Sequence, residues 1–167
     1  HLSIRRQRQM CIRDRPMPRD LLKRMLGAAN FDMGFQTVEY IASALVDLTF
    51  HEGPAPVDIM ARQTEILSEI NMPDAIGMRH ATPQFAHVFA GDGYSSAYYS
   101  YMWSEVMDAD AFASFESLGG AFDPERAQSL HDCILSKGGS EDAEQLYLAF
   151  RGRMPDASAL LKNRGLD

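Results

Sequence analysis

The sequence predicts an all-α protein. From Pro16 onward, apolar residues recur every three or four positions, which is the spacing of an α-helix. Glycine and proline breaks separate these segments, and no stretch of useful length alternates apolar and polar residues as a strand would. The 167 residues suit one domain or part of one, and 46% apolar and 23% charged residues are ordinary values for a globular protein.

The first three predicted helices precede an irregular stretch. The first contains the apolar residues at positions 21, 22, 25 and 26 and is closed by Gly27. The second covers residues 32–51 and stops at the glycine and proline break at 53–56, and the third covers residues 57–70. The second helix has an apolar stripe of Val38, Ile41, Leu45 and Leu48, parts of which are expected to pack against a missing half of the domain. The third helix is expected to point Ile59, Ile66, Leu67 and Ile70 inward.

Four further helices follow residues 75–94, which are the least regular part of the chain. A long helix is expected over residues 96–116, with a stop at Gly119-Gly120. The remaining three start at an Asp123 cap with Pro124 in the first position, at a Ser140 cap and after Pro155, and they end near Ser136, near Phe150 and at Gly165.

The basic residues are concentrated at the start of the chain. Residues 1–15 carry five arginines and one aspartate and have neither helical nor strand periodicity. Without them the chain retains 11 basic and 22 acidic residues, a net charge of −11 that disfavours a nucleic-acid partner. The string at residues 9–15 resembles translated sequencing-adapter sequence, so we interpret residues 1–15 as a non-native, adapter-derived segment.

The sequence has no recognisable signal for export or for insertion into a membrane. The arginine-rich start lacks the apolar core of a signal peptide, and no uncharged apolar run approaches the roughly 20 residues of a membrane span. Two cysteines, Cys11 and Cys133, do not indicate a disulfide framework. We therefore expect a cytoplasmic protein without a membrane partner.

His51-Glu52 invites interpretation as the start of a zinc-binding helix with the pattern His-Glu-x-x-His. This pattern needs a second histidine four residues after the first, on the same helix face. The residue at that position is Ala55, and Pro54 breaks the helix. We therefore interpret His51 as a helix C-terminal residue that faces the negative end of the helix dipole.

Other metal and nucleophile patterns are missing from the sequence. There is no Cys-x-x-Cys, no Gly-x-Ser-x-Gly, and no pair of histidines four residues apart on one helix. Cys133 lies in a predicted helix between Leu130 and Ile134, so it is interpreted as a small buried residue. We expect no complete metal site within this chain.

Four of the six tyrosines lie between residues 94 and 101. On a helix Tyr98, Tyr101 and Glu105 share one face, and Tyr94 joins them if the helix extends back. Buried phenols need hydrogen-bond partners, so three on one face are unusual for a core. These rings could instead cover a helix–helix seam with their hydroxyls in water.

A glycine-flanked loop precedes these tyrosines and favours a functional interpretation. Gly91 and Gly93 allow positive φ and motion, as a loop that covers a substrate requires.

Residues 85–106, from Phe85-Ala86-His87 through Ser104-Glu105-Val106, resemble the C-terminal motif of the thimet oligopeptidase family of zinc metallopeptidases, which includes peptidyl-dipeptidases and oligopeptidase A. The similarity continues at residues 37–45, 110–112, 134–140, 150–153 and 164–166. This resemblance implies that residues 16–167 form the C-terminal, helical part of a zincin-type catalytic domain.

The resemblance also implies roles for individual residues. In this family two histidines of His-Glu-x-x-His and a later glutamate hold zinc, and all three precede the equivalent of Gln36, so this chain has no metal ligands. His87 matches the histidine that hydrogen-bonds the substrate backbone, and Tyr94 matches a mobile-loop tyrosine. Tyr98 and Tyr101 match tyrosines that reach toward the scissile carbonyl.

We therefore expect Tyr98, Tyr101 and His87 to be catalytic and His87, Tyr94, Gly91 and Gly93 to bind substrate. The expected function is a zinc metallopeptidase that removes C-terminal dipeptides from short peptides, with the zinc held by a missing N-terminal part of the same domain. An endo-acting oligopeptidase and a non-catalytic helical interaction module remain alternatives.

Overall fold

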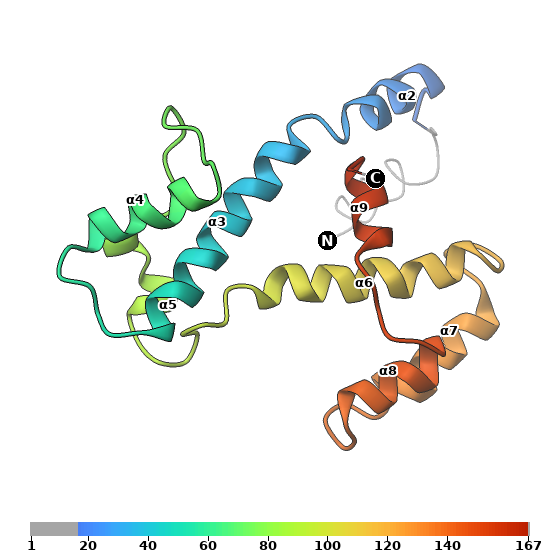
Figure 1. Ribbon diagram of the computed structural model, residues 1–167. Helices are drawn as coiled ribbons and strands as arrows, with labels where there is room; N and C mark the ends of the chain where they lie inside the picture. Colours follow the sequence, from blue (N-terminus) through green and yellow to red (C-terminus); the bar gives the residue numbers. More distant parts are fainter. Residues whose placement is uncertain (1–16, 167) are drawn as a thin grey trace, which may run out of the picture. The chain divides into compact units, whose positions relative to one another are not determined.

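The computed structural model describes residues 17–166 (Figure 1). Every regular element in this range is a helix, which confirms the prediction of an all-α protein. The chain divides into two compact units, His1–Met33 and Gly34–Asp167. The predicted adapter-derived segment, residues 1–15, lies outside the described residues. None of the helices in the described range has both the length and the apolar character needed to cross a bilayer.

The described part of the first unit contains α2, Arg19–Ala28. Gly27 lies inside the last turn of this helix, so the prediction that it closes the helix is wrong. Ala29 follows the helix with right-handed φ and ψ, and its N–H donates to the carbonyl of Leu26 at 3.3 Å. The residue that follows α2 is not left-handed, so the end of this helix does not require a glycine.

The helix α3, Met33–Glu52, presents small and polar side chains to the interior. Its buried residues are Ala42, Ser43, Ala44, Val46 and Asp47. Val38 and Ile41 are 43% and 37% exposed, so the described residues do not bury the first half of the predicted apolar stripe. The side chains of Tyr40 and Asp47 connect this helix to the segment before α6.

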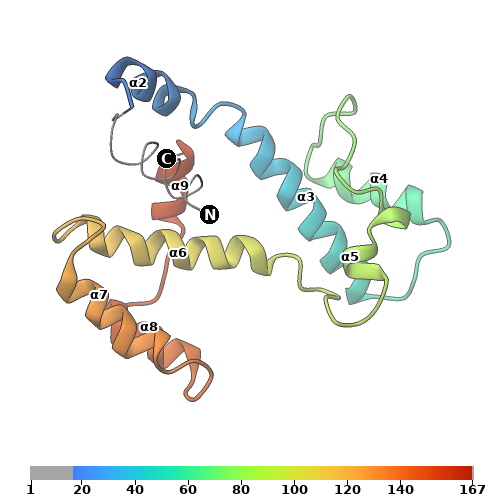
Figure 2. The same ribbon diagram turned by 180° about the vertical axis from the view of Figure 1, so that it is seen from behind.

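The helix α4, Ile59–Glu69, and the short 3₁₀-helix η1, Thr82–Gln84, are joined by a buried amide. The Oε1 atom of Gln63 accepts hydrogen bonds from the backbone N–H and the hydroxyl of Thr82, at 2.8 and 2.9 Å. Ile66 is buried as predicted, whereas Ile59 is 42% exposed. After η1 the chain forms α5, Ala86–Phe89, beside the C-terminal end of α3 (Figures 1 and 2).

The long helix α6 covers Ser100–Glu116 and begins later than the predicted start at residue 96. Ser96 has a φ of 58°, a left-handed conformation that a helix cannot contain. Tyr98 therefore lies in the turn before α6 rather than on the helix. The predicted stop is confirmed, since Gly120 has a φ of 91° and its N–H donates to the carbonyl of Phe115 at 2.9 Å.

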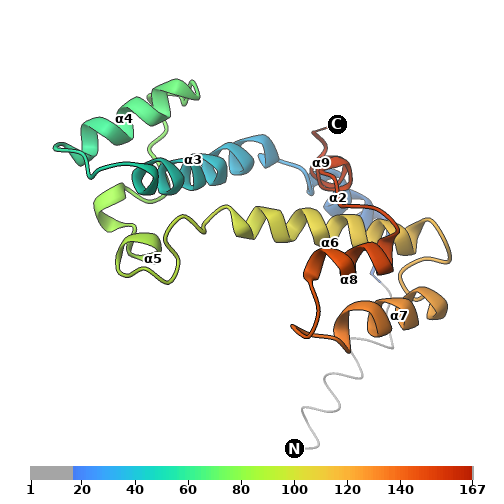
Figure 3. The same ribbon diagram turned by 60° about the horizontal axis from the view of Figure 1, so that its bottom comes forward.

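The C-terminal helices begin at α7, Pro124–Leu130, which Asp123 caps through Arg126 N at 2.8 Å, as predicted. This helix continues as a π-helical turn η2, His131–Leu135, and α8, Ala143–Arg151, packs beside η2 (Figure 3). Asp142 caps α8, so the prediction of a Ser140 cap is wrong. The last helix, α9, Ser158–Arg164, packs on α6 and ends at Gly165 as predicted.

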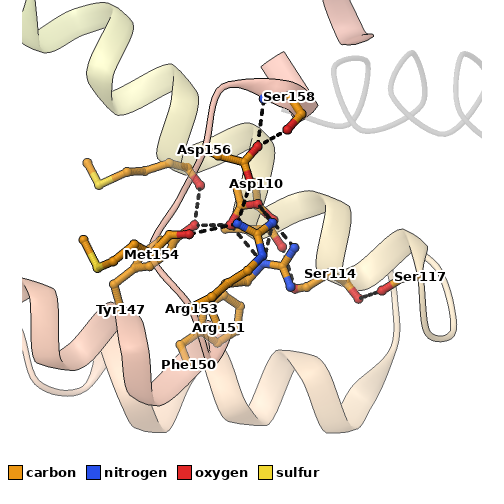
Figure 4. Close-up of polar contacts among 12 residues, drawn as sticks. Asp110, Ser114, Ser117, Tyr147, Phe150, Arg151, Arg153, Met154, Asp156 and Ser158 are labelled. Carbon is orange, nitrogen blue, oxygen red and sulfur yellow. Dashed lines mark hydrogen bonds and ion pairs between the residues drawn. The ribbon is translucent and has the colours of Figure 1, made fainter. Parts of the chain in front are cut away.

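A buried carboxylate joins α6 to the chain around α8 (Figure 4). Asp110 is fully buried and accepts hydrogen bonds from the Tyr147 hydroxyl at 2.7 Å and from Arg151 Nε at 2.9 Å. Arg153 also forms an ion pair with Asp110. Asp110 belongs to the stretch 110–112 and the two arginines to the stretch 150–153, so this contact joins two of the stretches noted for their similarity.

Candidate active site

An open pocket of about 520 Å³ lies where α3, the segment from His80 to α5 and the start of α6 meet. This volume is in the range of pockets that bind small ligands. The lining side chains are mostly aromatic: Tyr40, His80, Gln84, Phe85, Ala86, His87, Tyr98 and Tyr101. Three of the predicted site residues are therefore part of one cavity.

His87 is placed by the short helix α5. The neighbouring Phe85 is only 2% exposed and packs edge-on against the ring of Tyr98, with centroids 4.9 Å apart. This buried ring anchors the segment and leaves His87 at the surface of the pocket. Nε2 of His87 lies 2.9 Å from the hydroxyl of Tyr101, within hydrogen-bond distance.

The predicted tyrosines gather around this imidazole. Tyr94 stacks on His87 with ring centroids 4.9 Å apart, and Tyr98 meets the same ring edge-on at 5.7 Å. Tyr98 and Tyr101 are themselves 5.5 Å apart. The four side chains form one aromatic group, although Tyr98 does not lie on the helix that was expected to align them.

Glu105 does not join this group, although it was expected on the same face. Its carboxylate forms an ion pair with Arg164, which also donates to the hydroxyl of Thr37 at 2.8 Å. Arg164 thus connects α9 to both α6 and α3. The similarity noted at residues 164–166 has a structural explanation in this contact.

The loop glycines behave differently from the prediction. Gly91 and Gly93 are exposed, and neither has a positive φ. The left-handed residue of this segment is Ser96. A methyl group added at either glycine would meet no atom within 4 Å, so this conformation does not require glycine there. Their role in binding a substrate remains a prediction.

Tyr40 was not among the predicted site residues. Its hydroxyl donates to the backbone carbonyl of Tyr98 and accepts from Met102 N at 3.2 Å, and its ring stacks on Tyr98 at 5.3 Å. Burial raises the pKa of the Tyr40 phenol, and the nearby Tyr98 and Glu105 act in the same direction. Tyr40 therefore stays protonated and acts as a neutral hydrogen-bond donor at physiological pH.

Asp47 was also missed. It is fully buried in α3, and its carboxylate accepts the backbone N–H groups of Ser96 and Tyr98 at 3.0 and 2.9 Å. The sequence carried a signal for both residues, because Tyr40, Asp47 and His51 lie seven and four residues apart and so form a polar stripe on one helix face.

His51 has the structural role that the sequence predicted, at the C-terminal end of α3. Its Nδ1 lies 2.7 Å from the Asp47 carbonyl and 2.9 Å from the Asp47 carboxylate. Both partners are acceptors, so Nδ1 carries the hydrogen. Among residues 17–166, no three histidine, cysteine or acidic side chains are grouped so that they could hold a metal ion. The described residues thus do not supply a ligand set for zinc.

The chemistry of this site is that of neutral hydrogen-bond donors. Phenol and imidazole groups can each donate to an oxygen that gains negative charge, and neither needs to be ionised first. Tyr101 is 48% exposed and lines the pocket.

Residues 3–166 match the sequence profile of Peptidase family M3, and the chain belongs to this family. The match begins inside the stretch 1–15 that the sequence analysis set apart; the adapter origin of that stretch stays a prediction.

The chain is similar to curated proteins of this family. It is 36% identical over 157 residues to Oligopeptidase A of Escherichia coli K12, and 35% identical over 156 residues to Dipeptidyl carboxypeptidase of Salmonella typhimurium LT2. It is 32% identical over 163 residues to the Probable cytosolic oligopeptidase A of Arabidopsis thaliana. Each comparison covers 90% of this chain and 22% of the relative, so the chain spans about a fifth of their length.

Proposed function

We propose that residues 16–167 belong to the catalytic domain of a peptidase and form one wall of its substrate cleft. The observation that carries this proposal is the pair formed by the Tyr101 hydroxyl and His87 Nε2, 2.9 Å apart at an open pocket of about 520 Å³. Membership of Peptidase family M3 supports the reaction class. The substrates we propose are short peptides.

Peptide hydrolysis creates a tetrahedral intermediate with a negatively charged oxygen. Tyr98 and Tyr101 are the proposed donors to this oxygen, because a phenol offers a hydrogen without first being ionised. With the hydrogen of His87 on Nε2, the imidazole donates to the Tyr101 oxygen and leaves the phenol hydrogen free for the substrate. With the hydrogen on Nδ1, the phenol donates to His87 until the substrate replaces that bond.

His87 and Tyr94 are the proposed contacts to the peptide backbone. Their rings are stacked, and Tyr94 is 59% exposed at the outer side of the pair. A peptide strand laid along this edge would be held in register before reaction, which lowers the entropic part of the barrier. Gly91 and Gly93 would belong to the same binding loop.

Zinc is the proposed cofactor of the complete enzyme, with ligands outside the described residues. Because these residues do not provide a ligand set, we assign no step of the reaction to a metal. The partner that would supply the ligands is another part of the same catalytic domain. We further propose a cytoplasmic location, in line with the name of the cytosolic relative from Arabidopsis thaliana.

The finer proposal is removal of dipeptides from the C-terminus of the substrate. The relatives carry both names, Oligopeptidase A and Dipeptidyl carboxypeptidase, at 36% and 35% identity, so identity favours neither mode. A substrate with an amidated C-terminus separates them. An enzyme that releases C-terminal dipeptides loses this substrate, whereas an endo-acting oligopeptidase cleaves it as well as the free acid.

A chimera tests the proposed function. The segment of Escherichia coli Oligopeptidase A that aligns with this chain, 22% of that protein, is replaced by residues 17–166. We expect the purified, zinc-loaded chimera to hydrolyse a quenched fluorescent peptide, and we expect His87→Ala to reduce that activity. A chimera that is folded and zinc-loaded but inert contradicts the proposal and supports the non-catalytic interaction module.

A further inference from the structure

The backbone around Tyr98 is held from one side by α3. The two carboxylate oxygens of Asp47 receive the N–H groups of Ser96 and Tyr98, one oxygen for each group, at 3.0 and 2.9 Å. Asp47 is fully buried, and burial of a carboxylate is costly unless such donors surround it. Nδ1 of His51, 2.9 Å from Asp47 Oδ1, provides the third donor.

The backbone carbonyl of Tyr98 is held by Tyr40, which lies seven residues before Asp47 on the same face of α3. The Tyr40 hydroxyl donates to the Tyr98 carbonyl and accepts from Met102 N at 3.2 Å. The N–H and the C=O of Tyr98 are therefore both bonded to side chains of one helix. The Tyr40 ring also stacks on the Tyr98 ring at 5.3 Å.

This attachment fixes a conformation that the local sequence does not favour. Ser96 has a φ of 58°, which is uncommon for a residue with a side chain. Asp47 binds the N–H of this residue, and Tyr40 binds the N–H of Met102 in the first turn of α6. The entry of α6 is thus tied to α3 at both ends of the turn that carries Tyr98.

We propose that Asp47 and Tyr40 are positioning residues that set the place of Tyr98 and, through the start of α6, of Tyr101 opposite His87. Neither side chain needs to touch the reacting atoms for this role. The attachment itself is a property of this chain, and its value for catalysis rests on the proposed function.

The attachment is tested in the full chain by amide hydrogen exchange measured with NMR. Asp47→Asn keeps the shape of the side chain but turns an acceptor into a donor, so we expect exchange at Ser96 and Tyr98 to become about tenfold faster or more. The matched control is Asp108→Asn, an exposed position on α6. Unchanged exchange at Ser96 and Tyr98 in Asp47→Asn overturns the proposal, as does an equal change throughout α3.

A second variant keeps the test decisive if Asp47→Asn does not fold. Tyr40→Phe removes only a hydroxyl, and we expect faster exchange at Met102 and an altered chemical shift of the Tyr98 ring. Tyr99→Phe is its control, since Tyr99 is 50% exposed and its hydroxyl has no partner among the described residues. Unchanged signals of Met102 and Tyr98 in Tyr40→Phe overturn the proposal.

Kinetics of the chimera separate positioning from general stability. We expect Asp47→Asn and Tyr40→Phe to lower kcat about tenfold with little change in KM, because misplaced donors weaken binding of the transition state more than of the substrate. A purely structural role would leave kcat per folded molecule unchanged, and that result overturns the positioning role. If Tyr98→Phe and Tyr101→Phe are both neutral, the proposed function fails instead, while the amide exchange still decides the attachment.

Discussion

The hydroxyl of Tyr101 lies 2.9 Å from Nε2 of His87, across 14 residues of sequence. The two residues come from different helices, α6 and α5, and a turn held by α3 separates them. A hydrogen bond between two exposed side chains contributes little to stability, because water competes for both groups. Under the proposed function its significance is chemical, since it would control where the phenol hydrogen points when a substrate binds.

The buried hydroxyl of Tyr147 gives a prediction about stability. Tyr147→Phe removes the donor to Asp110 at 2.7 Å, and a hydrogen bond to a charged group contributes about 1.5–3 kcal/mol. We expect the free energy of unfolding to fall by that amount in urea titrations at pH 7. A loss below about 0.5 kcal/mol, the usual effect of a surface substitution, would show that this bond contributes nothing.

The same residue predicts a pH dependence. Burial, followed by the hydrogen bond to Asp110, raises the pKa of Tyr147 above its ordinary value of 10.0. Below pH 10.0 the phenol is protonated in both states and its contribution is fully present. Above that pH the unfolded chain loses the proton first, so stability falls as pH rises. Tyr147→Phe should unfold with a weaker alkaline dependence than wild type, and an identical dependence contradicts this assignment.

The stability of the fold should depend strongly on Asp110, the buried carboxylate of α6. Asp110→Asn leaves Arg151 and Arg153 without their buried partner, and breaking a buried ion pair in this way costs about 3–5 kcal/mol. Asp108→Asn, an exposed change on the same helix, should cost less than about 0.5 kcal/mol. Thermal unfolding of the two variants compares them directly. Equal melting temperatures would mean that the charge of Asp110 is not needed.

The loop before Tyr98 should affect binding and turnover together. Tyr94→Phe in the chimera is expected to change KM and kcat in parallel, because closure of the loop precedes reaction. Gly93→Ala should keep the stability of the fold within about 0.5 kcal/mol, since its added methyl meets no atom within 4 Å. A parallel change in both constants on Gly93→Ala would then report loop motion. An effect of Tyr94→Phe on kcat alone would argue against a covering loop.

The interpretation of residues 1–15 leads to a deletion experiment. If this segment is not native, a chain that starts at residue 16 should have no less helix per molecule by far-ultraviolet circular dichroism. The comparison uses equal molar concentrations of the two purified chains. A clear loss of helix on deletion would show that the segment belongs to the protein.

The fold could be predicted where local rules decide the structure. The Asp123 cap and the glycine stop at Gly120 depend on nearby backbone groups, and both were predicted correctly. The start of α6 was wrong because a distant carboxylate, Asp47, holds the turn in which Ser96 adopts a positive φ. Helical periodicity at residues 96–99 contains no information about that contact.

Only part of the candidate site could be predicted from the sequence, because some of its residues are far from the motif along the chain. His87, Tyr98 and Tyr101 lie close together in sequence, and their grouping follows from one motif. Tyr40 and Asp47 approach the motif from 62 and 49 residues away in their contacts with Met102 and Ser96. Their only local signal was a polar stripe on α3, which the apolar residues at 38 and 41 obscured.

The central claim is that phenol hydroxyls in this chain stabilise the charge that develops during peptide hydrolysis. The most direct measurement is kcat of the zinc-loaded chimera carrying Tyr98→Phe or Tyr101→Phe, with Tyr99→Phe as the control. At least one of the two should lower kcat about 10²–10³-fold, as loss of an oxyanion donor does elsewhere, with a much smaller change in KM. If both variants retain near-normal kcat at full zinc content, the tyrosines are packing residues and the account is wrong.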